Sequence, residues 1–144
     1  MTEPTPEPRR EFQLPAEDEE ALDRAGERWE AIKQGNAQWV LVHGVDVPPG
    51  YTVKRASVAL NIPTGYPDSQ VDMAYFHPDL TPVDGRPIKA LSKQSIDGKQ
   101  WQRWSRHRTS ANPWVPGVDD VGTHLIQVRH WVAREVADLG ENAA

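Results

Sequence analysis

Histidines and the absence of cysteine define the chemistry that this chain of 144 residues can support. Because it contains no cysteine, it has no thiol nucleophile, no disulfide and no cysteine-ligated zinc or iron–sulfur cluster. His124 and His130 are six positions apart, which does not match the i, i+4 spacing of metal ligands on one helix. We therefore predict no metal site and no cofactor, and we interpret both residues as solvated. His43, in a strand-like run, is expected to be a histidine paired within a sheet.

His77 is the histidine with the most constrained surroundings, in Phe76-His77-Pro78-Asp79-Leu80. Pro78 disfavours the helical conformation of the residue before it, so His77 is expected to be extended. Two roles remain open for the imidazole. It can orient the adjoining loop through ring hydrogen bonds, or it can act as an acid or base beside Asp79 if a cleft lies there.

A basic segment supplies the other candidate residues. Residues 86–108 contain seven basic residues and one acidic residue, whereas residues 1–31 contain ten acidic and four basic ones. Such a segment can bind an acidic protein surface, a carboxylate or a phosphate, or can simply be an exposed basic loop. No Gly-x-Ser-x-Gly elbow and no phosphate-binding glycine loop is present. The candidate partner-binding residues are Arg103, Arg106, His107 and Arg108.

The first element that positions these residues is predicted to be a helix. Residues 1–14 are rich in proline and charge, and we expect them to be a disordered tail. Pro15 suits a first helical turn, and the acidic residues after it favour the positive end of the helix dipole. The helical spacing extends this prediction to Gly35-Asn36, where the helix would end. The residues that share its apolar face are Leu22, Ala25, Trp29 and Ile32.

Strands and a second helix follow. Alternating runs over residues 38–47, 53–62 and 71–76 predict strands joined by proline- and glycine-rich turns, which favours an antiparallel meander. Residues 78–110 break any period and predict long loops with at most one further short strand. A stripe from Val118 to Val136, with Asp119 as N-cap, predicts a long helix. The fold class is therefore α+β, with a domain over 15–139 and a disordered tail over 140–144.

Three motifs in this order resemble the ubiquitin-conjugating enzyme fold: Asn61-Ile62-Pro63-Thr64-Gly65-Tyr66-Pro67, the His77-Pro78-Asp79 element and Asn112-Pro113-Trp114-Val115-Pro116. Residues 71–76, 101–107 and 114–117 look similar to the bacterial branch called prokaryotic family E of ubiquitin-conjugating-like proteins. The resemblance covers roughly residues 26–137. It implies an N-terminal helix, an antiparallel meander of three to four strands, a long loop region and a C-terminal helix.

The resemblance also implies where catalysis is lost. Active members carry a cysteine about ten residues after a His-Pro-Asn element and use it to form a thioester. Residues 86–90 stand at that spacing without a cysteine, and Asp79 replaces the asparagine that supports the oxyanion. An ionised carboxylate cannot donate that hydrogen bond, and Ser92 or Lys89 would form adducts that discharge less readily. The expected degenerate site consists of His77, Pro78, Asp79, Ile88 and Lys89.

The function implied is that of a cysteine-less binding or scaffold subunit in a bacterial ubiquitin-like modification pathway. The implied partners are a ubiquitin-like protein, a ThiF-type activating enzyme and, as a further candidate, a JAB-type metallopeptidase. We expect a cytoplasmic protein, because no apolar run approaches the ~20 residues that cross a bilayer and residues 1–10 lack a signal-peptide core.

Two alternatives remain open at this point. The first is an enzyme that uses His77 or His107 as general base, which requires a cleft where these groups converge. The second is a single-stranded nucleic-acid binder whose bases stack on Trp101 and Trp104, which requires exposed indoles. The acidic net charge of −5 and the short basic segment weigh against nucleic acid.

Overall fold

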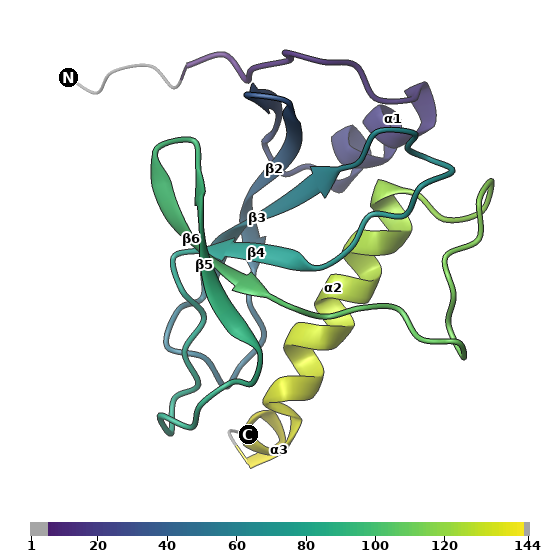
Figure 1. The fold of residues 1–144 in the computed structure, drawn as a ribbon. Coiled ribbons are helices and arrows are strands. Elements are labelled where there is room, and N and C mark those ends of the chain that lie inside the picture. Colours follow the sequence, from purple (N-terminus) through teal and green to yellow (C-terminus); the bar gives the residue numbers. More distant parts are fainter. Residues whose placement is uncertain (1–5, 143–144) are drawn as a thin grey trace.

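The computed structural model describes residues 6–142 and has an α+β architecture, with one antiparallel sheet and helix α2 lying across one of its faces (Figure 1). Its six strands are ordered β1-β2-β3-β4-β6-β5. The predicted fold class, with an N-terminal helix, a meander and a C-terminal helix, is confirmed. The elements in chain order are α1 (Ala16–Ala25), β1 (Trp29–Gln34), β2 (Ala37–Asp46), β3 (Arg55–Ile62), β4 (Ala74–His77), β5 (Leu91–Ile96), β6 (Lys99–Trp104), α2 (Val121–Glu135) and α3 (Ala137–Asn142).

The first predicted helix is wrong in its second half. Helix α1 ends at Ala25 because Gly26 adopts a left-handed conformation with φ of 85°, a common helix stop. Residues 29–34 form β1 instead, and the two-residue turn Gly35-Asn36 joins it to β2 as a hairpin. Trp29 and Ile32 therefore do not share a helix face. They lie in apolar clusters on opposite faces of the sheet.

The region after Pro78 contains more structure than the sequence predicts. A hairpin of β5 and β6 turns at Asp97-Gly98, where both residues have positive φ, and β6 pairs with β4. An Asp-Gly pair between two strands is a strong hairpin signal, which the irregular surroundings obscured. The predicted third strand is confirmed in a shorter form as β4. Helix α2 starts one residue later than expected, because Asp120 rather than Asp119 forms the capping box with Thr123.

Apolar clusters cover both faces of the sheet. The larger one lies between the sheet and α2 and includes Phe76, Trp104 and Val132. The smaller one, on the other face, joins Trp39 and Tyr75 to Ile96 and Trp101 of the hairpin. The sheet curls so that the hairpin tip reaches β1: Gln34 Nε2 donates to the Ser95 carbonyl at 3.0 Å, and the Asp97 amide donates to Gln34 Oε1 at 2.8 Å.

Residues 6–14 differ from the expected tail. They run beside β1, where the Glu11 amide donates to the Ala31 carbonyl at 2.7 Å and the Ala31 amide donates to the Arg9 carbonyl at 2.9 Å. Leu14 is buried and Arg9 pairs with Glu30 and Asp97. One apolar anchor and a double ion pair hold a segment whose composition alone suggests disorder. At the other end, residues 140–142 belong to α3, and the rest of both expected tails lies outside the described residues.

Within residues 6–142, no helix combines the length and the apolar character needed to cross a bilayer.

Candidate functional site

The loop that leaves β4 is the first part of the candidate site. His77 is the last residue of β4, and its Nδ1 donates to the Gln100 carbonyl of β6 at 3.1 Å. Its ring also lies 5.6 Å from that of Trp101, measured between centroids. These contacts fix the imidazole at the edge of β6, as an orienting role requires.

Gln102 ties the next part of this loop to the sheet. Its Oε1 accepts from the Leu80 amide at 2.9 Å, and its Nε2 donates to the Leu80 carbonyl at 3.1 Å. The same Oε1 also accepts from Trp104 Nε1 at 2.9 Å. Gln102 is buried, so these bonds satisfy polar groups that water cannot reach. Our sequence analysis missed Gln102, although a polar residue between two tryptophans of one strand is a signal for such a role.

Asp79 is paired with Lys93 of β5 by a short ion pair at the protein surface. The Asp79 carboxylate therefore faces an ammonium group. An ionised carboxylate cannot donate a hydrogen bond, so this position offers negative charge where an oxyanion site needs a donor.

Ile88 and Lys89 lie away from this loop. The Lys89 carbonyl accepts from Arg106 Nη1 at 2.9 Å, while Ile88 packs against the larger apolar cluster. In the described part of the chain, no hydrogen bond or ion pair joins either residue to His77 or Asp79. The segment that faces the His-Pro-Asp loop in space is the β5–β6 hairpin. Residues about ten positions after Asp79 in the chain are not the ones that bind it. The hairpin instead brings Lys93, 14 positions away, to Asp79.

The two candidate bases do not converge. His107 Nδ1 lies 2.7 Å from Asp72 Oδ2, and Asp72 comes two residues before β4, whereas His77 ends that strand. The histidines therefore sit at opposite ends of β4. The His107 side chain is 60% exposed, and its carboxylate partner fixes one ring nitrogen while the other remains accessible. The structure thus does not support joint action of His77 and His107.

The basic candidates divide into structural and exposed residues. The Arg108 side chain is 6% exposed, lies 3.4 Å from Asp119 and stacks over Trp114. Arg106 is 19% exposed and contacts Glu135 at 3.5 Å as well as the Lys89 carbonyl. Both arginines therefore fix the loops around them. Arg103 is half-buried, which leaves His107 as the most accessible of the four.

The indoles of Trp101 and Trp104 are 2% and 0% exposed, so they have no face on which a base could stack. The nucleic-acid alternative based on them is wrong. The interpretation of His124 as solvated is also wrong: it is fully buried, and its Nε2 donates to the Met73 carbonyl at 2.8 Å. Burial lowers the pKa of His124 and favours the neutral ring. His130 is exposed, and His43 is paired with Glu30 and Ser57 across the sheet.

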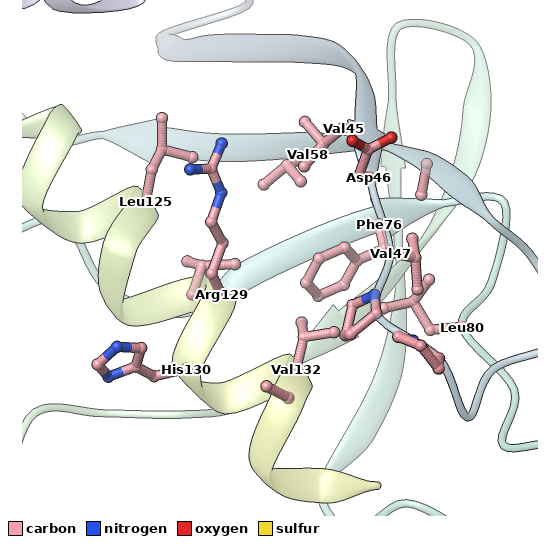
Figure 2. Close-up of a pocket in the computed structure, with 15 residues that line it drawn as sticks. Val45, Asp46, Val47, Val58, Phe76, Leu80, Leu125, Arg129, His130 and Val132 are labelled. Carbon is pink, nitrogen blue, oxygen red and sulfur yellow. The ribbon is translucent and has the colours of Figure 1, made fainter. Parts of the chain in front are cut away.

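A pocket of about 560 Å³ opens between α2 and the sheet (Figure 2). Arg129 projects from α2, and Asp46 stands at the end of β2 on the opposite wall (Figure 2). A pocket between a helix and a sheet depends on the tertiary arrangement and cannot be read from hydropathy patterns, so our sequence analysis did not predict it. Its walls are mostly apolar and include Val45, Pro48, Pro49, Ala56, Val58, Phe76, Leu80, Leu125, Val128, Val132 and Ala133.

The comparison with protein families gives one match. A model of the family described as prokaryotic E2 family E matches residues 14–135, which is most of the chain. Neither a curated protein nor a solved structure matches it. The α+β fold agrees with the ubiquitin-conjugating-like architecture that the sequence motifs imply. The chain therefore belongs to prokaryotic E2 family E, and it does so without a cysteine.

Proposed function

We propose that this protein is a non-catalytic binding or scaffold subunit of a bacterial ubiquitin-like modification pathway. The observation that carries the proposal is the absence of cysteine from a chain of this family. Thioester transfer needs a thiolate, which is both a strong nucleophile and a good leaving group. A chain without one can still hold a modifier or an enzyme through its surface.

The geometry of the His-Pro-Asp loop supports this proposal. Gln102 binds the loop backbone through two hydrogen bonds, and Lys93 is ion-paired with Asp79. The Lys93 side chain is engaged with a carboxylate, and the buried Gln102 amide that already binds the loop is not free to bind a substrate. The polar groups of the loop therefore serve to hold its structure.

The surface around His107 is the proposed contact for an acidic partner. His107 is exposed, and the half-buried Arg103 lies in the same basic segment. Arg106 and Arg108 instead bind carboxylates of their own chain and hold the loops around them. Charge of one sign favours partners of the opposite sign and speeds their association. The candidate partners are a ubiquitin-like protein, a ThiF-type activating enzyme and a JAB-type metallopeptidase.

A binding experiment tests the proposal. The protein is titrated by calorimetry with the ubiquitin-like protein, the activating enzyme and the peptidase encoded in the same genome. We expect one of them to bind, and we expect His107→Glu to weaken that binding about fivefold or more by adding a negative charge to a surface that faces an acidic partner. His130→Glu, which changes an exposed histidine on α2, is the matched control and should leave affinity unchanged. Absence of binding to all three partners would contradict the proposal.

A second candidate function rests on the Asp72–His107 pair. A carboxylate 2.7 Å from Nδ1 orients an imidazole so that its Nε2 can accept a proton, as a general base must. On this alternative, the protein hydrolyses or transfers a ubiquitin-like modifier without cysteine. Turnover of a modifier–peptide conjugate that is lost in both His107→Gln and Asp72→Asn would favour it over the scaffold. Equal product with and without the protein would exclude it.

A further inference from the structure

Three polar side chains on the neighbouring strands β1, β2 and β3 form a hydrogen-bonded row across the sheet. Glu30 Oε1 of β1 lies 2.9 Å from His43 Nε2 of β2, and His43 Nδ1 lies 2.9 Å from Ser57 Oγ of β3. A hydroxyl, an imidazole and a carboxylate bonded in this order are the parts of an activated-serine site. Such a site is recognised by its geometry, on any fold and without a local sequence motif.

The charge of Glu30 determines which ring nitrogen of His43 carries the proton. The Glu30 side chain is 5% exposed, and hydrogen bonds from the Arg9 guanidinium hold its pKa well below the usual value, so it is ionised at neutral pH. An ionised carboxylate only accepts hydrogen bonds, so His43 Nε2 donates to it. In the neutral ring, Nδ1 then keeps the lone pair and accepts from the Ser57 hydroxyl. The serine proton therefore points at a base.

An irregularity in β2 accompanies this contact. The register of β2 against β3 shifts between Val42 and Val45, where β2 has one residue more than β3. His43 lies in this bulge, and the next residue, Gly44, has a φ of 68° that few other residues adopt. A bulge redirects the side chains of its strand, and bulges are frequent beside active sites. Here the bulged residue is the one that contacts both Glu30 and Ser57.

The serine end of the row is open to small molecules. The His43 side chain is 28% exposed, and Ser57 is half-buried. His77, also half-buried, is the partner of Ser57 across β3 and β4, so an imidazole stands on each side of the hydroxyl. Because Ser57 is only partly exposed between two rings, a small acyl group fits this place better than the end of a folded modifier does.

We propose that Ser57 is a reactive hydroxyl that accepts an acyl group from small activated esters. His43 is the base, and Glu30 is the residue that positions it. In this step the bond between Ser57 Oγ and the acyl carbon forms, and the bond between that carbon and the leaving oxygen breaks. The serine proton passes to His43 Nδ1 and then to the leaving oxygen, which departs as an alcohol. The inference goes beyond the proposed function and uses other residues, so either can fail without the other.

Acetylation by p-nitrophenyl acetate tests the proposal. The full chain is incubated with this ester, quenched in acid and examined by intact-mass and peptide mass spectrometry. We expect rapid acetylation of Ser57, with release of p-nitrophenolate. His43→Gln should slow it about a hundredfold or more, since a positioned base contributes about 10²- to 10⁴-fold. Glu30→Gln should slow it at least about tenfold, because an amide can also donate and so permits the unproductive tautomer.

Matched variants separate reactivity from folding. Ser57→Ala should abolish the modification, whereas Ser92→Ala, at an exposed serine of β5, and His130→Gln, at an exposed histidine of α2, should leave its rate unchanged. Glutamine at position 43 keeps hydrogen-bonding groups but is not a base, and circular dichroism checks that each variant is folded. An unmodified Ser57 in the wild-type protein, or equal rates of Ser57 acetylation in wild type and folded His43→Gln, would overturn the proposal.

Discussion

The His77–Leu80 loop, which leaves β4, and the large pocket between α2 and the sheet, which Phe76 of β4 lines, are built differently. The loop is bonded to β6 and β5 through His77, Leu80 and Asp79. The pocket is open apolar volume beside α2, and Ile126 of that helix is exposed. Leu80 belongs to both regions, because its backbone binds Gln102 while its side chain lines the pocket.

The difference teaches where this protein has room to bind. In the His77–Leu80 loop, the chain's own polar groups bond one another. On the helix side, apolar surface lines an open pocket that no side chain of residues 6–142 fills. A surface that has already formed its bonds contributes stability, whereas an incompletely covered apolar surface has free energy left to gain from association.

Removing the Gln102 side chain should have the largest effect on stability. Gln102→Ala leaves the Leu80 amide, the Leu80 carbonyl and the Trp104 indole nitrogen without partners in a buried site. Each buried unsatisfied group costs about 1–3 kcal/mol, so we expect a loss of about 3 kcal/mol or more. Urea unfolding followed by tryptophan fluorescence measures it. A loss below about 1 kcal/mol would mean that the loop is not held as described.

A pair of identical substitutions compares packing in the two regions directly. Ala56 lines the pocket, whereas Ala74 of β4 is fully buried beside Trp104 and lies outside it. Ala74→Val should cost about 1–3 kcal/mol by overpacking. Ala56→Val places its added methyl groups in open volume and should be neutral or stabilising. Equal losses in the two variants, measured by urea unfolding, would show that the pocket is not open space.

The ion pair between Arg9 and Glu30 of β1 should make stability depend on acid. Hydrogen bonds from the Arg9 guanidinium hold the pKa of Glu30 well below its usual value of 4.5. A depressed carboxyl pKa contributes stability above the usual value, and this contribution is lost as the pH falls through the folded-state pKa. Because Arg9 is 39% exposed, we expect only about 1 kcal/mol from it.

Glu30→Gln removes this titration and tests the assignment. Unfolding free energies measured between about pH 3 and pH 7 should fall less steeply for the variant than for the wild type. Ile126→Ser, at an exposed position of α2, should keep the wild-type slope. If the unfolding free energies of wild type and Glu30→Gln changed in parallel with pH, the Arg9–Glu30 ion pair would not contribute to the pH dependence.

The smallest effect is expected from the Asp79–Lys93 pair. Both side chains are about half exposed, at 43% and 56%, so solvent screens the pair. Lys93→Ala should change the free energy of unfolding by less than about 0.5 kcal/mol. A double-mutant cycle with Asp79→Ala measures the coupling itself. A coupling above about 1 kcal/mol would make Asp79 a structural residue of the loop rather than a surface one.

Part of the fold was predictable from local signals. The alternation in β2 and β3 and the stripe of α2 identified those elements, and the ordered motifs indicated the family. The helix-like spacing of Trp29 and Ile32 failed because Gly26 stops α1 and a hairpin turn follows. The β5–β6 hairpin was missed because its polar strand β5 has little hydropathic contrast.

The candidate site was less predictable than the fold. His77 ends the third strand, as its motif suggested, but Gln102, which binds the loop at Leu80, is 22 positions from Leu80 in the chain and belongs to a hairpin that was not predicted. Burial of Arg108 and His124 depends on how loops and α2 meet the sheet, and no local pattern encodes that contact. The pocket depends on the same tertiary arrangement.

The most direct test of the central claim is intact-mass spectrometry of the protein after incubation with its activating enzyme, ATP and the ubiquitin-like protein. A cysteine-containing conjugating enzyme serves as the positive control. The account predicts that the mass of this protein stays unchanged while the control gains one modifier. A covalent adduct on this protein that discharges to an amine acceptor would contradict the account and identify it as an enzyme.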